Sequence, residues 1–393
     1  MKEVWIISGV RTAIGSFGGA LKDVPALELG VITAKEAIKR AGVETDVFGD
    51  VIAGQCMMRT DEINIGRCIG LKAGVPPTVP GCTIQRQCSS SMQGMVFGAQ
   101  QIMLDEHDAV LISGVESMSR VPYALYDMRW GARMWAKTAV DQLMEGLQDP
   151  LGHFLMGVTA ENLAEKYDIS REEQDELAAI SQSRALAAID SGRFKDEIIP
   201  VEIKTRKGTT IFDTDEHPRR GTTVETLAKL KAVFKTDGTG TVTAGNASGL
   251  NDGAAAMVVM SADRAKELGL KPLARLVSHA VGAVEPELMG YGPVPATKKA
   301  LKKAGMTLKD MELIELNEAF AAQYLACERL LELDRDITNV NGSGIALGHP
   351  VGATGIRIII SLLHEMQKRD LTTGMASLCV GGGMGKTVIL ERI

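Results

Sequence analysis

The chain has 393 residues, of which 45% are hydrophobic and 23% are charged, and its formal net charge is −6. This composition is that of a globular chain long enough for two core-forming units. The net negative charge predicts no nucleic-acid partner. No apolar run reaches the length of a membrane span, so we do not expect membrane insertion either.

Six cysteines are present, and none belongs to a C-x-x-C pair. Zinc ribbons and thioredoxin-like redox motifs are therefore excluded. No signal peptide precedes the first apolar run, so we expect reduced thiols in a cytoplasmic protein.

The first segment, 1–118, alternates short β-rich runs with stretches of helical periodicity. Gly42 gives the first helix a stop signal. The pattern is typical of an α/β unit. It predicts strands at 4–8, 51–54 and 109–114 and helices at 28–41 and 89–104.

The middle segment, 119–249, has a different character. A Met/Trp-rich stretch is followed by a clear helix at 170–190, which the capping-box pattern from Ser170 to Glu173 introduces and Gly192 ends. Polar, Thr- and Gly-rich stretches follow. We expect an inserted loop domain and not a continuation of the sheet.

The last segment, 250–393, resembles the first. Residues 35–43, KEAIKRAGV, recur as 298–306, KKALKKAGM, and each copy precedes a short apolar strand. Internal duplication of an α/β unit is the simplest account, and chance similarity of Ala/Lys-rich helices is the alternative. Sites in α/β sheets form at the carboxyl ends of strands, so loops of both halves should supply the chemistry.

Cys88 lies where an apparent helix begins. Free backbone N–H groups and the helix dipole would lower its thiol pKa and favour a nucleophilic thiolate. The alternative is a buried structural cysteine.

Three further residues stand beside glycines or strand ends. His349 lies in GHPVGATG, where a narrow turn could hold a general base, although a lone loop histidine is more often a surface residue. Cys379 precedes Gly381, the first of three glycines whose N–H groups could form an oxyanion hole or simply a turn with positive φ. Asn317 follows a strand and could donate to an oxyanion or cap a helix.

One motif resembles a nucleotide-binding loop but does not fit its full pattern. GMGKT at 383–387 resembles the end of a phosphate-binding loop, but Val380 stands where the first glycine is required. The following residues, 388–390, read as a strand and not as a helix. Nucleotide hydrolysis is therefore excluded.

Taken in order, the motifs CSS at 88–90, GNASGLNDG at 245–253, NEAF at 317–320, GHPVGATG at 348–355 and CVGGG at 379–383 closely resemble the thiolase family. The resemblance covers essentially the whole chain. It implies the thiolase fold, a duplicated five-layered α/β/α/β/α core with an inserted loop domain. It implies an N-terminal half at 1–118, a CoA-binding loop domain at 119–249 and a C-terminal half at 250–393.

The resemblance also implies roles. Cys88 matches the acylated nucleophile, His349 the base that activates it, and Cys379 the second acid/base. Asn317, through a water, and His349 match one oxyanion hole, and the N–H groups of Cys88 and Gly381 match the other. The positions expected to bind the CoA substrate are Arg219, Ser248, Met156, Ala319, Phe320 and Leu250.

The expected activity is reversible cleavage of 3-ketoacyl-CoA by ping-pong acyl transfer, without metal or organic cofactor. Leu155 stands where acetoacetyl-type thiolases usually carry histidine, which favours longer acyl chains in β-oxidation. Acetoacetyl-CoA thiolase is the alternative. Gln85 and Ser91 also depart from the usual pattern. Cys379 argues against a decarboxylating condensing enzyme, and the intact triad of Cys88, His349 and Cys379 argues against a non-catalytic acyl-CoA carrier. The family suggests a homotetramer or dimer.

Overall fold

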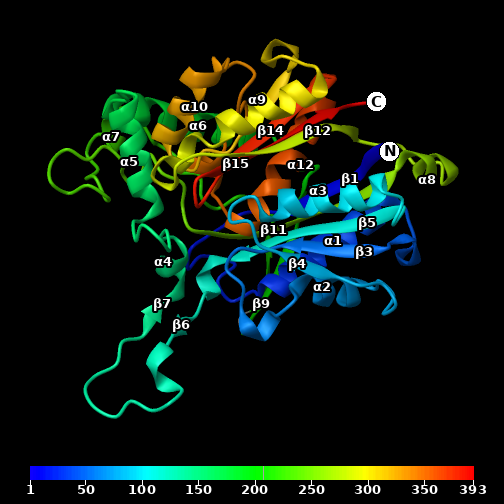
Figure 1. Ribbon diagram of the computed structural model, residues 1–393, viewed down its shortest axis with the longest axis horizontal. Helices are drawn as coiled ribbons and strands as arrows, with labels where there is room; N and C mark the ends of the chain where they lie inside the picture. The colour runs from blue at the N-terminus through cyan, green and yellow to red at the C-terminus, as the bar shows by residue number, and fades with distance from the viewer. Residues whose placement is uncertain (207) are drawn as a thin grey trace.

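The computed structural model describes residues 1–206 and 208–393. No helix within these ranges is long and apolar enough to cross a membrane. The architecture consists of two similar halves, and a further segment interrupts the first of them (Figure 1).

The first half is built on strands in the order β1, β11, β5, β3, β4. β11 runs antiparallel to both neighbours, whereas β3 runs parallel to β5. All eleven residues of β11 are buried, as its apolar sequence requires of a central strand. The first half therefore takes its central strand from beyond the inserted segment. Its elements are β1 Val4–Thr12, β2 Gly15–Ser16, α1 Ala26–Ala41, β3 Asp50–Gly54, α2 Ile65–Ala73, β4 Cys82–Ile84, α3 Ser90–Met103, β5 Ala109–Ser117, β11 Asn251–Ser261 and α8 Ala262–Glu267.

The second half repeats this pairing scheme in the order β12, β15, β14, β13. β15 is antiparallel to both neighbours, and β13 is parallel to β14. The duplication predicted from the sequence is thus confirmed. The elements are β12 Ala274–Ala283, α9 Pro293–Ala304, β13 Leu313–Leu316, α10 Ala321–Leu331, α11 Gly344–Leu347, α12 Val351–Arg369, β14 Thr373–Val380 and β15 Met384–Glu391.

The repeated helix sequence ends in the same way in both halves. Gly42 after α1 and Gly305 after α9 adopt left-handed conformations, with φ of 68° and 67°. Each glycine N–H reaches carbonyls of the last helical turn, which would otherwise lack donors.

The two sheets meet at β1 and β12 through only two residue pairs, Trp5 with Arg275 and Ile6 with Ala274. Helices α3 and α12 pack against each other between the sheets, α1 and α2 cover one outer face, and α9 and α10 cover the other. The five-layered α/β/α/β/α core is therefore confirmed. Its centre joins side chains of both halves, such as Ile112, Ile358 and Leu378.

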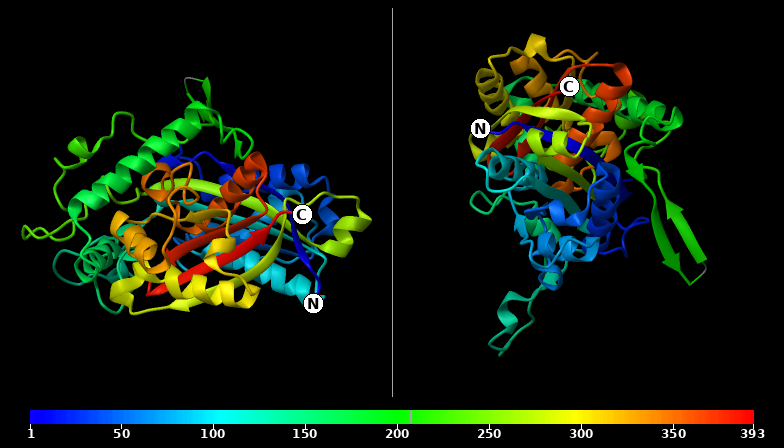
Figure 2. Two further views of the ribbon diagram at one scale, coloured as in Figure 1. Left: turned by 90° about the horizontal axis from the view of Figure 1, so that it is seen from above. Right: turned by 90° about the vertical axis from the view of Figure 1, so that its right-hand side faces the viewer.

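The inserted segment lies mostly outside the sheets. The predicted capping box is present, since Ser170 accepts from the N–H of Glu173 and the Glu173 carboxylate accepts from the N–H of Ser170. An exception to the expected separation is β8, which pairs with β1. Figure 2 shows the β9–β10 hairpin projecting from the body. The elements are β6 Tyr123–Ala124, β7 Val140–Asp141, α4 Gln142–Gly146, α5 Met156–Lys166, α6 Arg171–Asp190, β8 Ile198–Ile199, β9 Val201–Thr205, β10 Gly208–Phe212 and α7 Val224–Leu227.

Candidate active site

Cys88 follows a tight turn that leads into α3. Gln87 has a positive φ of 45°, which is uncommon for a residue with a side chain. The Ser90 hydroxyl secures the turn, because it accepts from the N–H of Arg86 at 2.9 Å and donates to the carbonyl of Gln87 at 2.6 Å. Cys88 is thereby held at the entrance of a central helix, as predicted.

The predicted lowering of the Cys88 thiol pKa is wrong. Burial raises this pKa to about 11, although hydrogen bonds from the N–H groups of Gly381 and Cys88 itself favour the thiolate. Desolvation of a charged sulfur outweighs a few donors. The thiol therefore needs a base in contact with it during attack.

Cys379 is fully buried near the end of β14. Burial, and secondly the sulfur of Cys88, hold its pKa well above the usual range. The three glycines that follow differ from one another in conformation. Gly382 and Gly383 have positive φ and turn the chain into β15, whereas Gly381 faces the site. A Cβ on Gly381 would lie 3.4 Å from Cγ of Gln87 and 3.6 Å from Sδ of Met156.

His349 is buried, not a surface residue, and its ring has a defined tautomer. Nδ1 lies 2.7 Å from the Thr354 hydroxyl, which itself donates to the carbonyl of Pro350 at 3.0 Å. Since that hydroxyl proton is used, Nδ1 must donate and Nε2 must carry the lone pair. Nε2 has no partner among the described residues. Burial, and secondly the charge of Arg357, lower the His349 pKa to about 3, so the imidazole is neutral.

Asn317 is buried after β13 and does not cap a helix, because α10 begins after Phe320. Its Oδ1 lies 3.4 Å from Nη2 of Arg357. Its Nδ2, like Nε2 of His349, finds no partner in the described part of the chain. Buried polar atoms without partners are rare in folded proteins and mark places where a water or a ligand is expected.

The helices that follow Cys88 and His349 are joined directly. The Ser91 hydroxyl on α3 accepts from the N–H of Ile356 on α12 at 3.1 Å. Gly355 admits the close contact, since a Cβ there would lie 2.6 Å from the N atom of Met92. Ser91, which departs from the usual pattern of the family, therefore provides a polar link between the two helices. Gln85, the second departure, lies beside Cys56, with Nε2 3.9 Å from its sulfur.

Most of the predicted substrate positions lie near the cysteines. The N–H of Ser248 donates to the carbonyl of Ala319 at 2.9 Å, and Ala247 forms a β-bridge with Phe320. Ala319 and Cys379 share one apolar cluster, against which Met156 and Phe320 pack. Leu250 joins a neighbouring cluster that Cys88 also contacts.

Arg219 lies apart from this group. Its backbone N–H donates to the Gln182 side chain on α6 at 2.8 Å, and its side chain is exposed. The adjacent Arg220 forms an ion pair with Asp190. Of these two neighbouring arginines, Arg220 is paired on the surface, and Arg219 makes no ion pair among the described residues.

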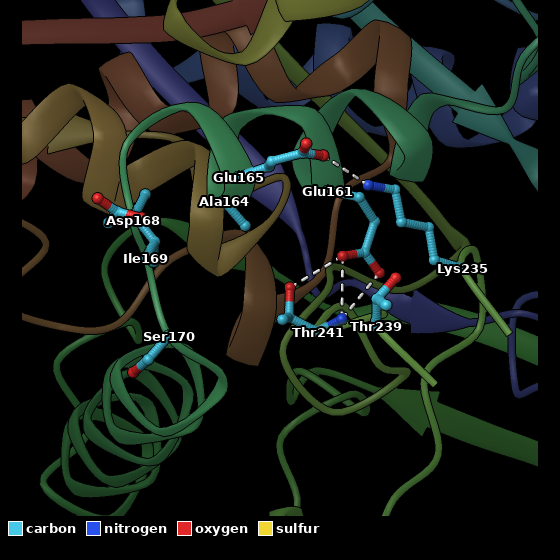
Figure 3. Close-up of a pocket in the computed structure, with 9 residues that line it drawn as sticks. All are labelled: Glu161, Ala164, Glu165, Asp168, Ile169, Ser170, Lys235, Thr239 and Thr241. Carbon is cyan, nitrogen blue, oxygen red and sulfur yellow. Dashed lines mark hydrogen bonds and ion pairs between the residues drawn. The ribbon is translucent and has the colours of Figure 1, made fainter. Parts of the chain in front are cut away.

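Sequence reasoning missed a buried residue that holds the stretch before Ser248 in place. The Glu161 carboxylate on α5 accepts from the N–H and hydroxyl of Thr241 at 2.9–3.1 Å (Figure 3) and from the N–H of Val242 at 2.9 Å. It thereby fixes the start of the stretch that reaches Ser248. The pocket beside Glu161 contains none of the predicted site residues. Sequence reasoning also missed Glu116, Thr354 and Arg357. The partners of Glu116 and Arg357 are distant in the sequence, and the partner of Thr354 cannot be recognised from the motif alone.

The fold and the site define a duplicated α/β protein whose site contains a half-buried cysteine, a buried cysteine and one neutral histidine. Residues 4–263 match the family model described as "Thiolase, N-terminal domain", and residues 270–392 match "Thiolase, C-terminal domain". The chain belongs to the thiolase family and is an acyltransferase.

Full-length relatives agree with this assignment. The chain is 49% identical over 394 residues to an acetyl-CoA acetyltransferase of Pseudomonas aeruginosa and 50% identical over 393 residues to the β-ketothiolase BktB of Cupriavidus necator, with 100% of both chains covered in each case. It superposes on the Bacillus anthracis acetyl-CoA acetyltransferase with a TM-score of 0.98 at 53% identity, covering 100% of this chain and 99% of the other. For human mitochondrial 3-ketoacyl-CoA thiolase the TM-score is 0.96 at 46% identity, with the same coverage.

Proposed function

We propose that this thiolase cleaves 3-ketoacyl-CoA with Cys88 as the nucleophile, His349 as its base and Cys379 as the second acid/base. The observation that carries the proposal is the pair of buried, unpartnered atoms, Nε2 of His349 and Nδ2 of Asn317. One is a lone pair able to take a thiol proton, and the other is a donor for a developing oxyanion.

In the first half-reaction, the Cys88 sulfur attacks the 3-keto carbon while His349 removes the thiol proton. The negative charge on the former keto oxygen is stabilised by a first oxyanion hole. The bond between C2 and C3 then breaks, the acyl group stays on Cys88 as a thioester, and Cys379 gives its proton to C2 of the departing acetyl-CoA. No electrons leave the system, so the step needs no redox cofactor.

In the second half-reaction, Cys379 takes the proton of the CoA thiol, and the CoA sulfur attacks the thioester on Cys88. The leaving Cys88 sulfur regains its proton from His349. Negative charge develops on the former keto oxygen in both half-reactions, and on the thioester oxygen of the departing acetyl-CoA enolate in the first, so two oxyanion holes are needed. We assign one to Asn317, through a water, with His349, and the other to the N–H groups of Cys88 and Gly381.

The inserted segment, 119–249, is proposed to bind CoA together with the loops that follow it. Ser248 and Ala319 are bonded to each other beside the cysteines and would line the path of the pantetheine chain. Met156, Phe320 and Leu250 would contact the thioester end. The exposed Arg219 would contact the CoA nucleotide, whose phosphates complement its charge.

We propose 3-ketoacyl-CoA longer than acetoacetyl-CoA as the preferred substrate, in degradation of fatty acids. Leu155 is the N-cap residue of α5, next to Met156, and offers an apolar side chain instead of an imidazole. Met128, Met134 and Trp135 lie between β6 and β7, and their side chains are exposed. The arm that this stretch forms projects from the body (Figure 1).

Acetoacetyl-CoA is the second candidate substrate. It is favoured by the names of the relatives, several of which are acetyl-CoA acetyltransferases. A homo-oligomer, dimer or tetramer, in the cytoplasm completes the proposal.

A thiolysis series with acyl chains of four to ten carbons tests the substrate class. Each buried methylene contributes about 0.8 kcal/mol, so two should raise kcat/KM by about tenfold if the acyl pocket is open. We expect 3-ketohexanoyl-CoA to be cleaved at least as efficiently as acetoacetyl-CoA. A steady fall in kcat/KM from four carbons to six would establish the acetoacetyl-specific alternative.

A further inference from the structure

Arg357 is a buried cation with an unusual set of partners. It lies on α12, is 1% exposed, and its Nε and Nη1 have no hydrogen-bond partner among the described residues. Within the described part of the chain, its side chain makes one hydrogen bond, from Nη2 to Oδ1 of Asn317 at 3.4 Å. The charged groups around it are Glu315 from β13, Arg11 from β1, and Glu197 and Asp215 from the inserted segment.

This contact decides which way the Asn317 amide points. An arginine side chain has five N–H donors and no acceptor, so only the oxygen of an amide can face it. Rotating the amide by half a turn would place an NH₂ group against the guanidinium and direct the oxygen into the site. The contact with Arg357 therefore sets the orientation of the amide. The Nδ2 donor on the opposite side of the amide has no partner among the described residues.

The backbone of Asn317 supports the same geometry. Its N–H donates to the carbonyl of Ser377 at 3.0 Å, which holds the residue against the sheet. Gly344 on α11 packs on the amide, since a Cβ there would lie 2.9 Å from Oδ1. The amide plane is thus enclosed, and Arg357 supplies the polar contact that distinguishes its two ends.

Arg357 also acts on the base. Its charge is the second cause, after burial, of the low pKa of His349. A cation behind the site disfavours a second positive charge on the imidazole. The same side chain thus keeps Asn317 in the donor orientation and His349 in the neutral form.

We propose that Arg357 is a positioning residue for the oxyanion hole, which it serves by fixing the Asn317 amide with Nδ2 toward the substrate. The proposal rests on the role of Asn317 in the proposed function. It adds a residue that does not touch the substrate and that acts through a defined partner.

A double-mutant cycle tests the pair in the full-length enzyme. We expect N317A to lower kcat for thiolysis of acetoacetyl-CoA and R357M to lower it by about tenfold or more, because one charge-assisted hydrogen bond is lost. In the N317A background, R357M should cost less than about twofold, since the amide it orients is absent. The KM for CoA should stay within about twofold of wild type in both variants.

The outcomes distinguish a failure of the proposed role of Asn317 from a failure of the proposed role of Arg357. If N317A leaves kcat unchanged, the oxyanion role of Asn317 fails, and the role of Arg357 fails with it. If N317A lowers kcat but R357M lowers it equally in both backgrounds, the proposed function stands and the inference is overturned. R184M is the matched control, because Arg184 donates only to the backbone carbonyls of 335, 338 and 339; its effects should be additive with N317A.

A second variant covers the case in which R357M does not fold. R357K keeps the buried charge but lacks the planar fork that reaches Oδ1. We expect R357K to keep kcat/KM flat in mild acid, since His349 stays neutral, while kcat falls as in R357M. A wild-type kcat in R357K would overturn the orienting role.

Discussion

Glu116 on β5 accepts a hydrogen bond from the N–H of Gly352 at 2.8 Å, and so ties a strand of the first half to the start of α12, the helix that follows His349 in the second. The same carboxylate accepts from the N–H groups of Cys56 and Met57 at 3.0 and 3.1 Å. The loop after β3 and the start of α12 therefore share one buried anchor.

The anchor gives folding stability a pH dependence of defined sign. Burial raises the pKa of Glu116 from 4.5 to about 7. Between these values the unfolded chain is ionised while the folded chain keeps the proton. This contribution to stability is therefore fully present below pH 4.5 and is lost as the pH rises through about 7. We expect E116Q, neutral at every pH, to lose less stability than wild type between about pH 5 and pH 8, measured as the shift of the urea midpoint.

The exposed Glu312 provides the control. Hydrogen bonds from the N–H groups of Thr373 and Thr372 lower its pKa below 4.5, so its transition lies outside this window. E312Q should show the wild-type loss between the two pH values. An equal loss in E116Q and wild type would contradict the assignment of this titration to Glu116.

Thr354 should matter for turnover and not for CoA affinity. T354V removes the hydroxyl that fixes the Nδ1–H tautomer of His349 while keeping the shape of the side chain. A neutral hydrogen bond is worth about 1 kcal/mol, so we expect kcat to fall by about fivefold to tenfold, with KM for CoA unchanged. Steady-state thiolysis kinetics measure both constants. T354S should recover the wild-type rate, and a wild-type kcat in T354V would show that the ring is held by other contacts.

Covalent acylation should occur at Cys88. After incubation with acetyl-CoA without a second substrate, peptide mass spectrometry should find the acetyl group on the peptide containing Cys88. C88S should abolish the label, whereas C379S should acquire it more slowly, because Cys379 gives its proton to the departing CoA in this direction. Acetyl found only on Cys379 would reverse the two cysteine roles.

Arg219 should contribute to CoA binding. We expect R219A to raise KM for CoA by up to about fivefold and to lower kcat less, as the loss of uniform binding does. R220A is the matched control, since that neighbour pairs with Asp190 and is equally exposed. If both variants keep the wild-type KM, Arg219 and Arg220 belong only to a solvated surface.

The sequence by itself predicted the residues proposed for the site and determined the plan of the fold. Residues 35–43 and 298–306 predicted the duplication because a helix stop at glycine is a local signal, and both copies end in that way. Cys88, His349 and Cys379 could be singled out because glycines and helix starts beside them are local as well. The longest strand and helix patterns needed only small corrections at their ends.

Only the tertiary structure decided the electrostatics and the supporting contacts. The direction of the Cys88 pKa shift was predicted wrongly, because the shift is set by burial, which depends on residues far away in the chain, such as Val351 in the apolar cluster that Cys88 contacts. Arg357 and Glu116 carry no local signal, since their partners lie 40 and 236 residues away. The placement of β11 within the first sheet also depended on long-range pairing, because a uniformly apolar run fits any central strand.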